Sequence, residues 1–180
     1  MGEVALRMID DGETVMLMTG PVCRQIATRI EDRSNLTVLT NSLSIGERIS
    51  RQPMNKGVLI GGDIDLQEQA VYGPLALDNV QRFFVNQLFI EVDGITEHLE
   101  MTVSSAAKAD LIRKVMQSAS RTIAICLPDH FGTRAFARLG MLSEVDAIVT
   151  DPSADDAYKT RVFGSGTPVF TSVVSLEDGA

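Results

Sequence analysis

The sequence predicts an α/β fold in which a mostly parallel, Rossmann-like sheet carries helices on both faces. Short apolar segments of strand length alternate with segments whose apolar residues recur at helical spacing, which favours parallel strands joined by crossover helices. Residues 88–95, Leu-Phe-Ile-Glu-Val-Asp-Gly-Ile, form a nearly continuous apolar run, typical of a strand buried on both faces. Turn-forming residues end most of the strand-length segments, as this fold requires.

The composition indicates one domain over residues 1–180. With 44% apolar and 22% charged residues, the chain can bury a sizeable core and resembles an ordinary globular protein. No apolar run approaches the roughly 18 residues of a membrane span, and no secretory signal is visible. The two cysteines do not suggest a disulfide scaffold, so we expect a reduced, cytoplasmic setting and no membrane partner. The net charge of -8 argues against DNA binding by this chain alone.

The strands are predicted as short apolar runs between turn residues. The first lies before Thr19-Gly20-Pro21, and the central one, residues 88–92, lies before Asp93-Gly94. A short extra strand is expected just before Gly73-Pro74, and the polar segment 96–105 is expected to be a loop over the strand ends. The strands are expected over residues 14–18, 36–40, 56–60, 70–72, 88–92, 122–127, 146–150 and 168–173.

Apolar residues three or four positions apart predict the helices. Val22, Ile26 and Ile30 share one face of a helix whose first turn holds Pro21, where a missing N–H costs little. The following helix can be capped by either of the two polar residues at 41–42. The helices are expected over residues 3–9, 22–30, 43–49, 74–84, 106–118 and 155–162.

Polar residues and glycines follow five of the predicted strands. The carboxyl ends of parallel strands meet at one edge of a sheet, and ligands bind in the crevice beyond that edge. Glycines let a backbone approach a ligand, amide groups at helix starts attract anions, and an aspartate accepts hydrogen bonds from hydroxyls. The residues brought to this edge are Thr19-Gly20, Asn41-Ser42, Gly61-Gly62, Asp93-Gly94 and Asp129-His130.

These turns favour a small phosphorylated molecule over a nucleotide. No lysine follows the glycines as in a Walker loop, and the Gly-x-Gly-x-x-Gly fingerprint of a dinucleotide fold is missing. Lys108 is a candidate cation if it turns toward the crevice rather than lying on a solvated helix face. Neither His98 nor His130 has the spacing of a metal site, so no metal and no cofactor are expected. Cys23, in a first helical turn, either has a lowered pKa or is a small core residue.

Short motifs follow one another in a specific order along the chain. They are Asp11-Gly12, Thr19-Gly20, Thr40-Asn41-Ser42, Gly61-Gly62, Gly73-Pro74, Asp93-Gly94-Ile95, Phe131-Gly132 and Ile148-Val149-Thr150-Asp151. Each motif is weak alone, but the ordered set is specific and covers nearly the whole chain. It resembles the effector-sensing domain of DeoR-family bacterial transcription regulators.

The resemblance implies a fold similar to ribose-5-phosphate isomerase and the CoA transferases. It further implies a domain that binds a phosphorylated sugar or related metabolite, assembles as a homo-oligomer and regulates transcription. In this family a winged helix-turn-helix normally precedes the sensor, and nothing in this chain matches one. We therefore expect DNA to be contacted only through a domain absent from this chain.

The chain departs from the family pattern in the turns expected to hold the ligand. The first turn reads Met-Thr-Gly-Pro-Val at residues 18–22, where the family usually has Asp-Ser-Gly-Thr-Thr. Ser104, Ser105 and Lys108 stand where the family usually has two threonines and a glutamate. Residues 127–132 read Leu-Pro-Asp-His-Phe-Gly against Asp-Ser-Ser-Lys-Phe-Gly. The scaffold is therefore better preserved than the pocket chemistry.

An enzyme of the same fold is the alternative interpretation. A sugar-phosphate isomerase would use a carboxylate such as Asp93 as its base, and a CoA transferase would need a nucleophilic glutamate, for which Glu91 is the candidate. No second acid or base is placed convincingly, so we expect a non-enzymatic regulator without catalytic residues. The expected ligand-binding residues are Thr19, Gly20, Asn41, Ser42, Gly61, Gly62, Asp93, Gly94, Lys108 and His130.

Overall fold

A seven-stranded parallel sheet forms the centre of the computed structural model, which describes residues 1–171. Every neighbouring pair of its strands is parallel, which confirms the predicted fold class. The order across the sheet is β12-β11-β9-β6-β1-β2-β3. The strands are β1 (Thr14–Leu17), β2 (Thr37–Thr40), β3 (Lys56–Leu59), β6 (Val85–Val92), β9 (Ala119–Cys126), β11 (Ala147–Thr150) and β12 (Val169–Thr171).

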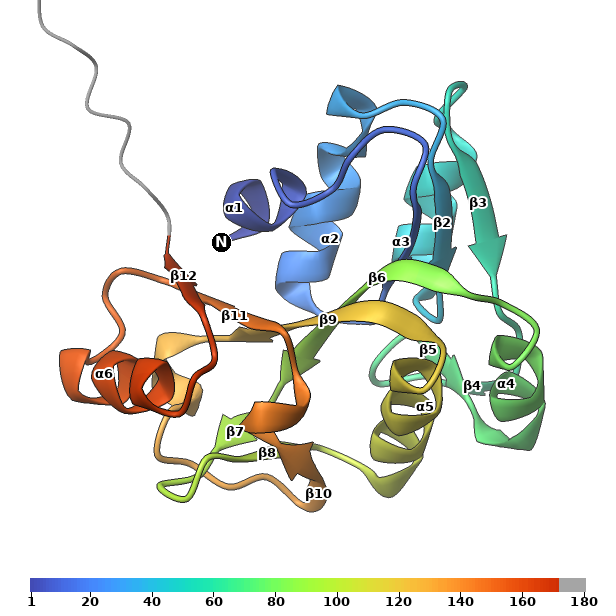
Figure 1. Ribbon diagram of the computed structural model, residues 1–180. Coiled ribbons are helices and arrows are strands. Elements are labelled where there is room, and N and C mark those ends of the chain that lie inside the picture. The colour runs from blue at the N-terminus through green and yellow to red at the C-terminus, as the bar shows by residue number, and fades with distance from the viewer. Residues whose placement is uncertain (172–180) are drawn as a thin grey trace, which may run out of the picture.

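Helices cover both faces of this sheet (Figure 1). Side chains alternate along a strand, so Leu17 and Phe89 pack on the first face, while Met16 and Leu88 pack on the second. The first face carries α1 (Gly2–Leu6), α2 (Pro21–Thr28) and α3 (Leu43–Ser50). The second face carries α4 (Gly73–Val80) and α5 (Ala106–Met116), and α6 (Asp156–Gly164) lies near β12.

Two small antiparallel sheets extend this core. The first is the hairpin of β4 (Asp63–Asp65) and β5 (Ala70–Tyr72), which includes the predicted extra strand. The second has the order β10-β8-β7, from β10 (Ala137–Met141), β8 (Glu100–Val103) and β7 (Gly94–Ile95). The part of the chain that the structure describes also contains three short 3-10 helices: η1 (Ile30–Asp32), η2 (Pro128–His130) and η3 (Leu142–Glu144).

The expectation of a loop over residues 96–105 is wrong for its second half. Residues 100–103 form β8, which pairs with both β7 and β10. Met101 and Val103 are fully buried. Thr102 between them is also buried, and its hydroxyl is satisfied by donating to the Gly94 carbonyl. The polar residues around this strand hid its apolar alternation in the sequence.

The remaining boundaries differ by a few residues from the expectations. Strand β9 begins at Ala119 because the β6 strand beside it already begins at Val85, and the two pair from their first residues. Residues 169–171 of the predicted last strand form β12, whereas residues 172–173 lie outside the described residues. Among residues 1–171, no helix has both the length and the apolar character needed to cross a membrane.

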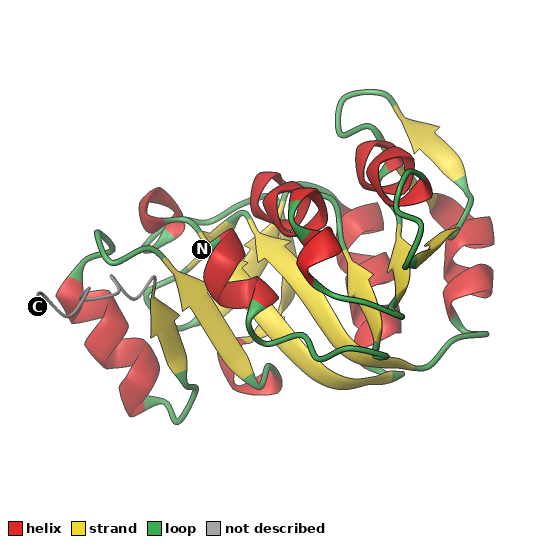
Figure 2. Ribbon diagram, turned by 90° about the horizontal axis from the view of Figure 1, so that it is seen from above, coloured by secondary structure: helices red, strands yellow, loops and turns green. Residues whose placement is uncertain are grey.

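The strand order reverses direction between β1 and β6. From β1 the chain continues outward to β2 and β3, whereas β6, β9, β11 and β12 follow one another on the opposite side. Figure 2, which looks onto the face that carries α1, shows these strands side by side across the molecule. In open α/β sheets such a reversal opens a crevice beyond the carboxyl ends of the two strands.

Candidate functional site

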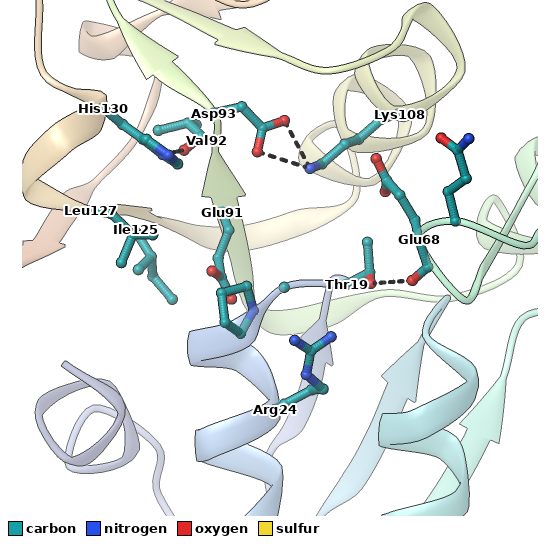
Figure 3. Close-up of a pocket in the computed structure, with 13 residues that line it drawn as sticks. Thr19, Arg24, Glu68, Glu91, Val92, Asp93, Lys108, Ile125, Leu127 and His130 are labelled. Carbon is teal, nitrogen blue, oxygen red and sulfur yellow. Dashed lines mark hydrogen bonds and ion pairs between the residues drawn. The ribbon is translucent and has the colours of Figure 1, made fainter. Parts of the chain in front are cut away.

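A cavity of about 220 Å³ lies at this reversal point. Its floor is formed by residues that end β1, β6 and β9, and its sides come from α2, α5, η2 and the loop between β4 and β5 (Figure 3). The lining residues are Thr19, Gly20, Pro21, Arg24, Gln67, Glu68, Glu91, Val92, Asp93, Lys108, Ile125, Leu127 and His130.

Asp93 and Lys108 form an ion pair on one side of the cavity. Lys108 lies on the inner side of α5 and is only 5% exposed, and its Nζ is 2.9 Å from Asp93 Oδ2 and 3.3 Å from Oδ1. The Ser104 amide also donates to Asp93 Oδ2 at 2.7 Å, while Ser105 caps α5 by accepting from the Lys108 amide. Lys108 therefore faces the crevice, and the Asp93 carboxylate already has two protein donors.

Glu91 is the buried carboxyl group of the cavity floor. It is 6% exposed, and its Oε1 accepts a hydrogen bond of 2.6 Å from the Cys23 amide in the first turn of α2. Burial raises the pKa of Glu91, while the α2 amides and Lys108 act in the opposite direction. A Cβ added at Gly20 would collide with this carboxyl group, so the glycine is needed for the close approach.

Cys23 is a core residue, and the alternative of a lowered pKa is wrong. Its side chain is fully buried, and its Sγ lies 3.8 Å from the Phe89 carbonyl oxygen. Burial raises the pKa of the Cys23 thiol well above its ordinary value, and the neighbouring Glu91 carboxyl raises it further. The helix start does not activate this thiol, because its amide groups are already bonded to Glu91.

The loop between β4 and β5 supplies a side of the cavity that the sequence did not predict. Glu68 lies on this side, and its backbone carbonyl accepts from Thr19 Oγ1 at 3.3 Å. Ser104 Oγ donates to Glu68 Oε1 at 2.7 Å, and the Tyr72 hydroxyl donates to Oε2. Burial of Tyr72 raises the pKa of its phenol, with Glu68 adding to the shift, so Tyr72 stays a neutral donor.

His130 and Arg24 line opposite sides of the cavity. His130 lies in η2, and its Nδ1 is 3.0 Å from the Val92 carbonyl oxygen, which fixes the ring against β6. Arg24 reaches from α2 toward the cavity, and its guanidinium forms no hydrogen bond or ion pair with any residue between positions 1 and 171. The cavity thus holds two cationic side chains, of which Lys108 is paired with Asp93.

Five of the ten expected ligand residues line the cavity, namely Thr19, Gly20, Asp93, Lys108 and His130. The other five lie outside it. Asn41 is buried and accepts from the Thr19 amide at 2.9 Å, and Ser42 caps α3 by accepting from the Ile45 amide. Gly62 packs so closely that a Cβ would lie 2.5 Å from the Tyr72 carbonyl oxygen. Gly61 precedes it after β3, and Gly94 belongs to β7.

Glu91, Arg24 and Glu68 are cavity residues that the sequence did not place among the ligand-binding residues. A charged residue within the apolar run 88–95 was the available signal for Glu91, which we weighed only as a nucleophile. Arg24 could have been found from its position one turn into the helix after Gly20. Glu68 had no such signal, because its place depends on how the β4–β5 hairpin folds back over β1.

Solved structures share the architecture of this domain. Ribose 5-phosphate isomerase A from Methanocaldococcus jannaschii superposes with a TM-score of 0.52 and 11% identity, covering 72% of this chain and 51% of that chain. The fold is therefore of the ribose-5-phosphate isomerase type, with its candidate site at the strand reversal. At this level of identity the likeness shows the fold alone.

The family follows from the sequence comparisons. The model of the DeoR C-terminal sensor domain matches residues 1–152, so this chain belongs to the DeoR family of transcription regulators. The transcriptional repressor GlcR of Bacillus subtilis is 26% identical over 88% of this chain and 60% of its own length. The transcriptional repressor AccR of Agrobacterium fabrum is 28% identical over 87% of this chain and 61% of its own length. The chain thus spans about three fifths of these relatives.

Proposed function

We propose that this domain senses a small polyhydroxylated metabolite with one anionic group, such as a phosphorylated sugar. The observation that carries the proposal is the cavity at the strand reversal, whose floor and sides present buried polar side chains. Family membership supports a regulatory role, and the resemblance implies a phosphorylated sugar or related metabolite. Asp93 and Glu91 offer acceptors for hydroxyl groups, while Arg24 offers charge to an anion.

Regulation then works by linkage between the cavity and a partner surface. A ligand that prefers one arrangement of domains or subunits shifts the population toward that arrangement. The affinity of the full regulator for DNA changes by the same coupling free energy. With its net charge of -8, this domain contributes to DNA binding through its arrangement rather than through phosphate contacts of its own. We also propose that it acts as a homo-oligomer in the cytoplasm, as the family resemblance implies.

The charged groups of the cavity support a sensor better than an enzyme. A general base must be within reach of the proton that it removes. Asp93 is paired with Lys108 and bonded to Ser104, and Glu91 accepts from the start of α2, so the protein already stabilises the charge of each carboxyl group. Their remaining lone pairs suit hydrogen bonds from the hydroxyl groups of a ligand. The relatives with the same sensor domain, GlcR and AccR, are named as repressors.

A ligand screen with an activity control tests this proposal. The domain is heated with each of a panel of sugars, polyols and their phosphorylated forms, and each compound that raises the melting temperature is then offered as an isomerase substrate. We expect at least one polyhydroxylated compound to stabilise the domain and none to be converted. Turnover of a hit would favour the isomerase alternative, and a panel without any stabilising compound would contradict the proposed ligand class.

A further inference from the structure

The start of α2, usually an attractive position for an anion, is filled by a carboxyl group of the protein itself. Free amide groups and the helix dipole at a helix start favour a negative group. Here Glu91 projects from β6 into this position and accepts from the Cys23 amide at 2.6 Å. Gly20, just before the helix, passes so close to this carboxyl group that no side chain fits between them. An effector phosphate would therefore collide with Glu91 here.

Lys108 is also unavailable as the main partner of an effector anion. It is 5% exposed, and Asp93 holds its Nζ at 2.9 Å. Separating this pair would leave the Asp93 carboxylate partly buried without its counter-charge. The free-energy cost is larger than the gain from a surface contact between Lys108 and an effector anion. The floor and the α5 side of the cavity therefore present carboxyl groups that already have internal partners.

Arg24 is different because its guanidinium has no protein partner within residues 1–171. It lies one turn into α2, between the cavity and a second hollow beside the first turn of α3, which Ser44 lines. Glu47 on α3 also lines this second hollow, and its carboxylate is paired with Arg51 at 2.5 Å. Arg24 therefore offers a free, forked donor set of the kind that binds phosphate or carboxylate in a bidentate manner.

We infer that Glu91 excludes anions from the start of α2 and that the effector points its anionic group outward, onto Arg24. Its hydroxyl groups then face Glu91 and Asp93 on the floor of the cavity. This orientation rests on the proposed function, because it describes how the proposed ligand lies in the same cavity. It makes Glu91 a specificity-determining residue, which rejects a molecule whose only strong contact is a phosphate at the helix start.

Inorganic phosphate separates the two anion positions without knowledge of the effector. Phosphate is titrated into the wild type and into the Glu91→Ala, Glu91→Gln and Arg24→Gln variants, while the amide signals of residues 22–23 and of Arg24 are followed by NMR. In the wild type we expect no saturable shift at residues 22–23. Glu91→Ala opens the helix start, so saturable shifts should appear at residues 22–23. The affinity of this variant for phosphate should be at least about tenfold higher than that of the wild type. Glu91→Gln removes the charge but keeps the volume, so its gain should be smaller.

The Arg24→Gln variant has a matched control in an arginine at the other end of α2. Arg29 directly follows α2 as its C-cap and is paired with Glu3 and Asp32, so Arg29→Gln should leave phosphate binding unchanged. Arg24→Gln should weaken binding to the wild type by about fivefold or more, since it removes a charge-assisted contact. Saturable wild-type shifts at residues 22–23, or no effect of Arg24→Gln, would overturn the inference. So would a folded Glu91→Ala or Glu91→Gln protein that gains no affinity.

The outcome is independent of the ligand screen on the wild type. If no panel compound binds but the phosphate titrations behave as expected, the proposed ligand class fails while the exclusion by Glu91 stands. If panel compounds bind but Glu91→Ala and Arg24→Gln leave phosphate binding unchanged, the proposed function stands and the orientation is wrong. Melting curves of every variant ensure that only folded protein is compared.

Discussion

The buried pair of Asp93 and Lys108 predicts an unequal response to removal of either charge. The Lys108 side chain is 6% exposed, whereas the Asp93 side chain is 29% exposed and also bonded to the Ser104 amide. Asp93→Asn leaves an ammonium group buried without its counter-charge. Lys108→Met keeps the packing of the long side chain and leaves a carboxylate that still has solvent and one backbone donor.

The magnitudes follow from this difference in burial. Removing one partner of a buried ion pair costs about 3–5 kcal/mol when the remaining charge is fully buried. We expect a loss in this range for Asp93→Asn. For Lys108→Met we expect about 1–2 kcal/mol, because partial solvation and the Ser104 amide compensate the Asp93 carboxylate. Both charges are absent in the double variant, which should therefore be more stable than Asp93→Asn alone.

Urea denaturation of the four proteins measures these free energies of unfolding. The double-mutant cycle isolates the coupling between the two side chains, provided that the m-value stays constant. Equal losses for both single variants, or a double variant no more stable than Asp93→Asn, would refute the reasoning. Such a result would mean that Lys108 is compensated in the absence of Asp93, by solvent or by the nearby Glu91 carboxyl group.

Three further predictions concern the buried groups at the start of α2 and the net charge. Because burial raises the pKa of the Cys23 thiol, iodoacetamide at pH 8 should label it at least about a hundredfold more slowly in the folded than in urea-unfolded protein, and fast labelling by mass spectrometry would contradict this. Because the folded pKa of Glu91 is raised, its contribution to stability is greatest below the ordinary carboxyl pKa of about 4.3 and is lost as the pH rises through the folded pKa. Denaturation curves should thus show the free energy of unfolding of Glu91→Gln rising relative to that of the wild type as the pH increases from the ordinary carboxyl pKa to the folded pKa. A difference in stability that does not change with pH would count against this prediction. This domain should not shift duplex DNA in a gel at low salt, given its net charge of -8, and submicromolar binding would disprove that expectation.

The fold could be predicted because its signals are local. The apolar run of β6, the proline in the first turn of α2 and the alternation of strands with helices each depend on neighbouring residues. Strands β4 and β10 were not predicted because their residues show no clear local pattern. The β4 residues are exposed, and β10 carries a register shift between Arg138 and Gly140, so neither shows a clean alternation.

The site was predictable only to the extent that parallel strands bring their carboxyl ends together. This rule placed Thr19, Gly20 and Asp93 correctly at one edge of the sheet. It could not tell that Asn41 turns inward to hold the Thr19 amide, because that depends on a contact across 22 positions. The same limit hid Glu68, whose contacts with Thr19 and Ser104 join segments that are distant in the sequence.

The altered sequence of the first turn and the burial of Glu91 both affect anion binding at the start of α2. A threonine pair after Gly20, as the family resemblance implies, would add hydroxyl donors where an anion binds, whereas Pro21 and Val22 offer fewer donors to a ligand. Glu91 bonds the Cys23 amide at this helix start, so the α2 dipole is satisfied within the chain. The loss of donors for a ligand and the presence of an internal carboxyl group thus both disfavour an external anion at the start of α2. In the proposed orientation, the effector brings its hydroxyl groups to the floor of the cavity and its charge to Arg24 at the rim.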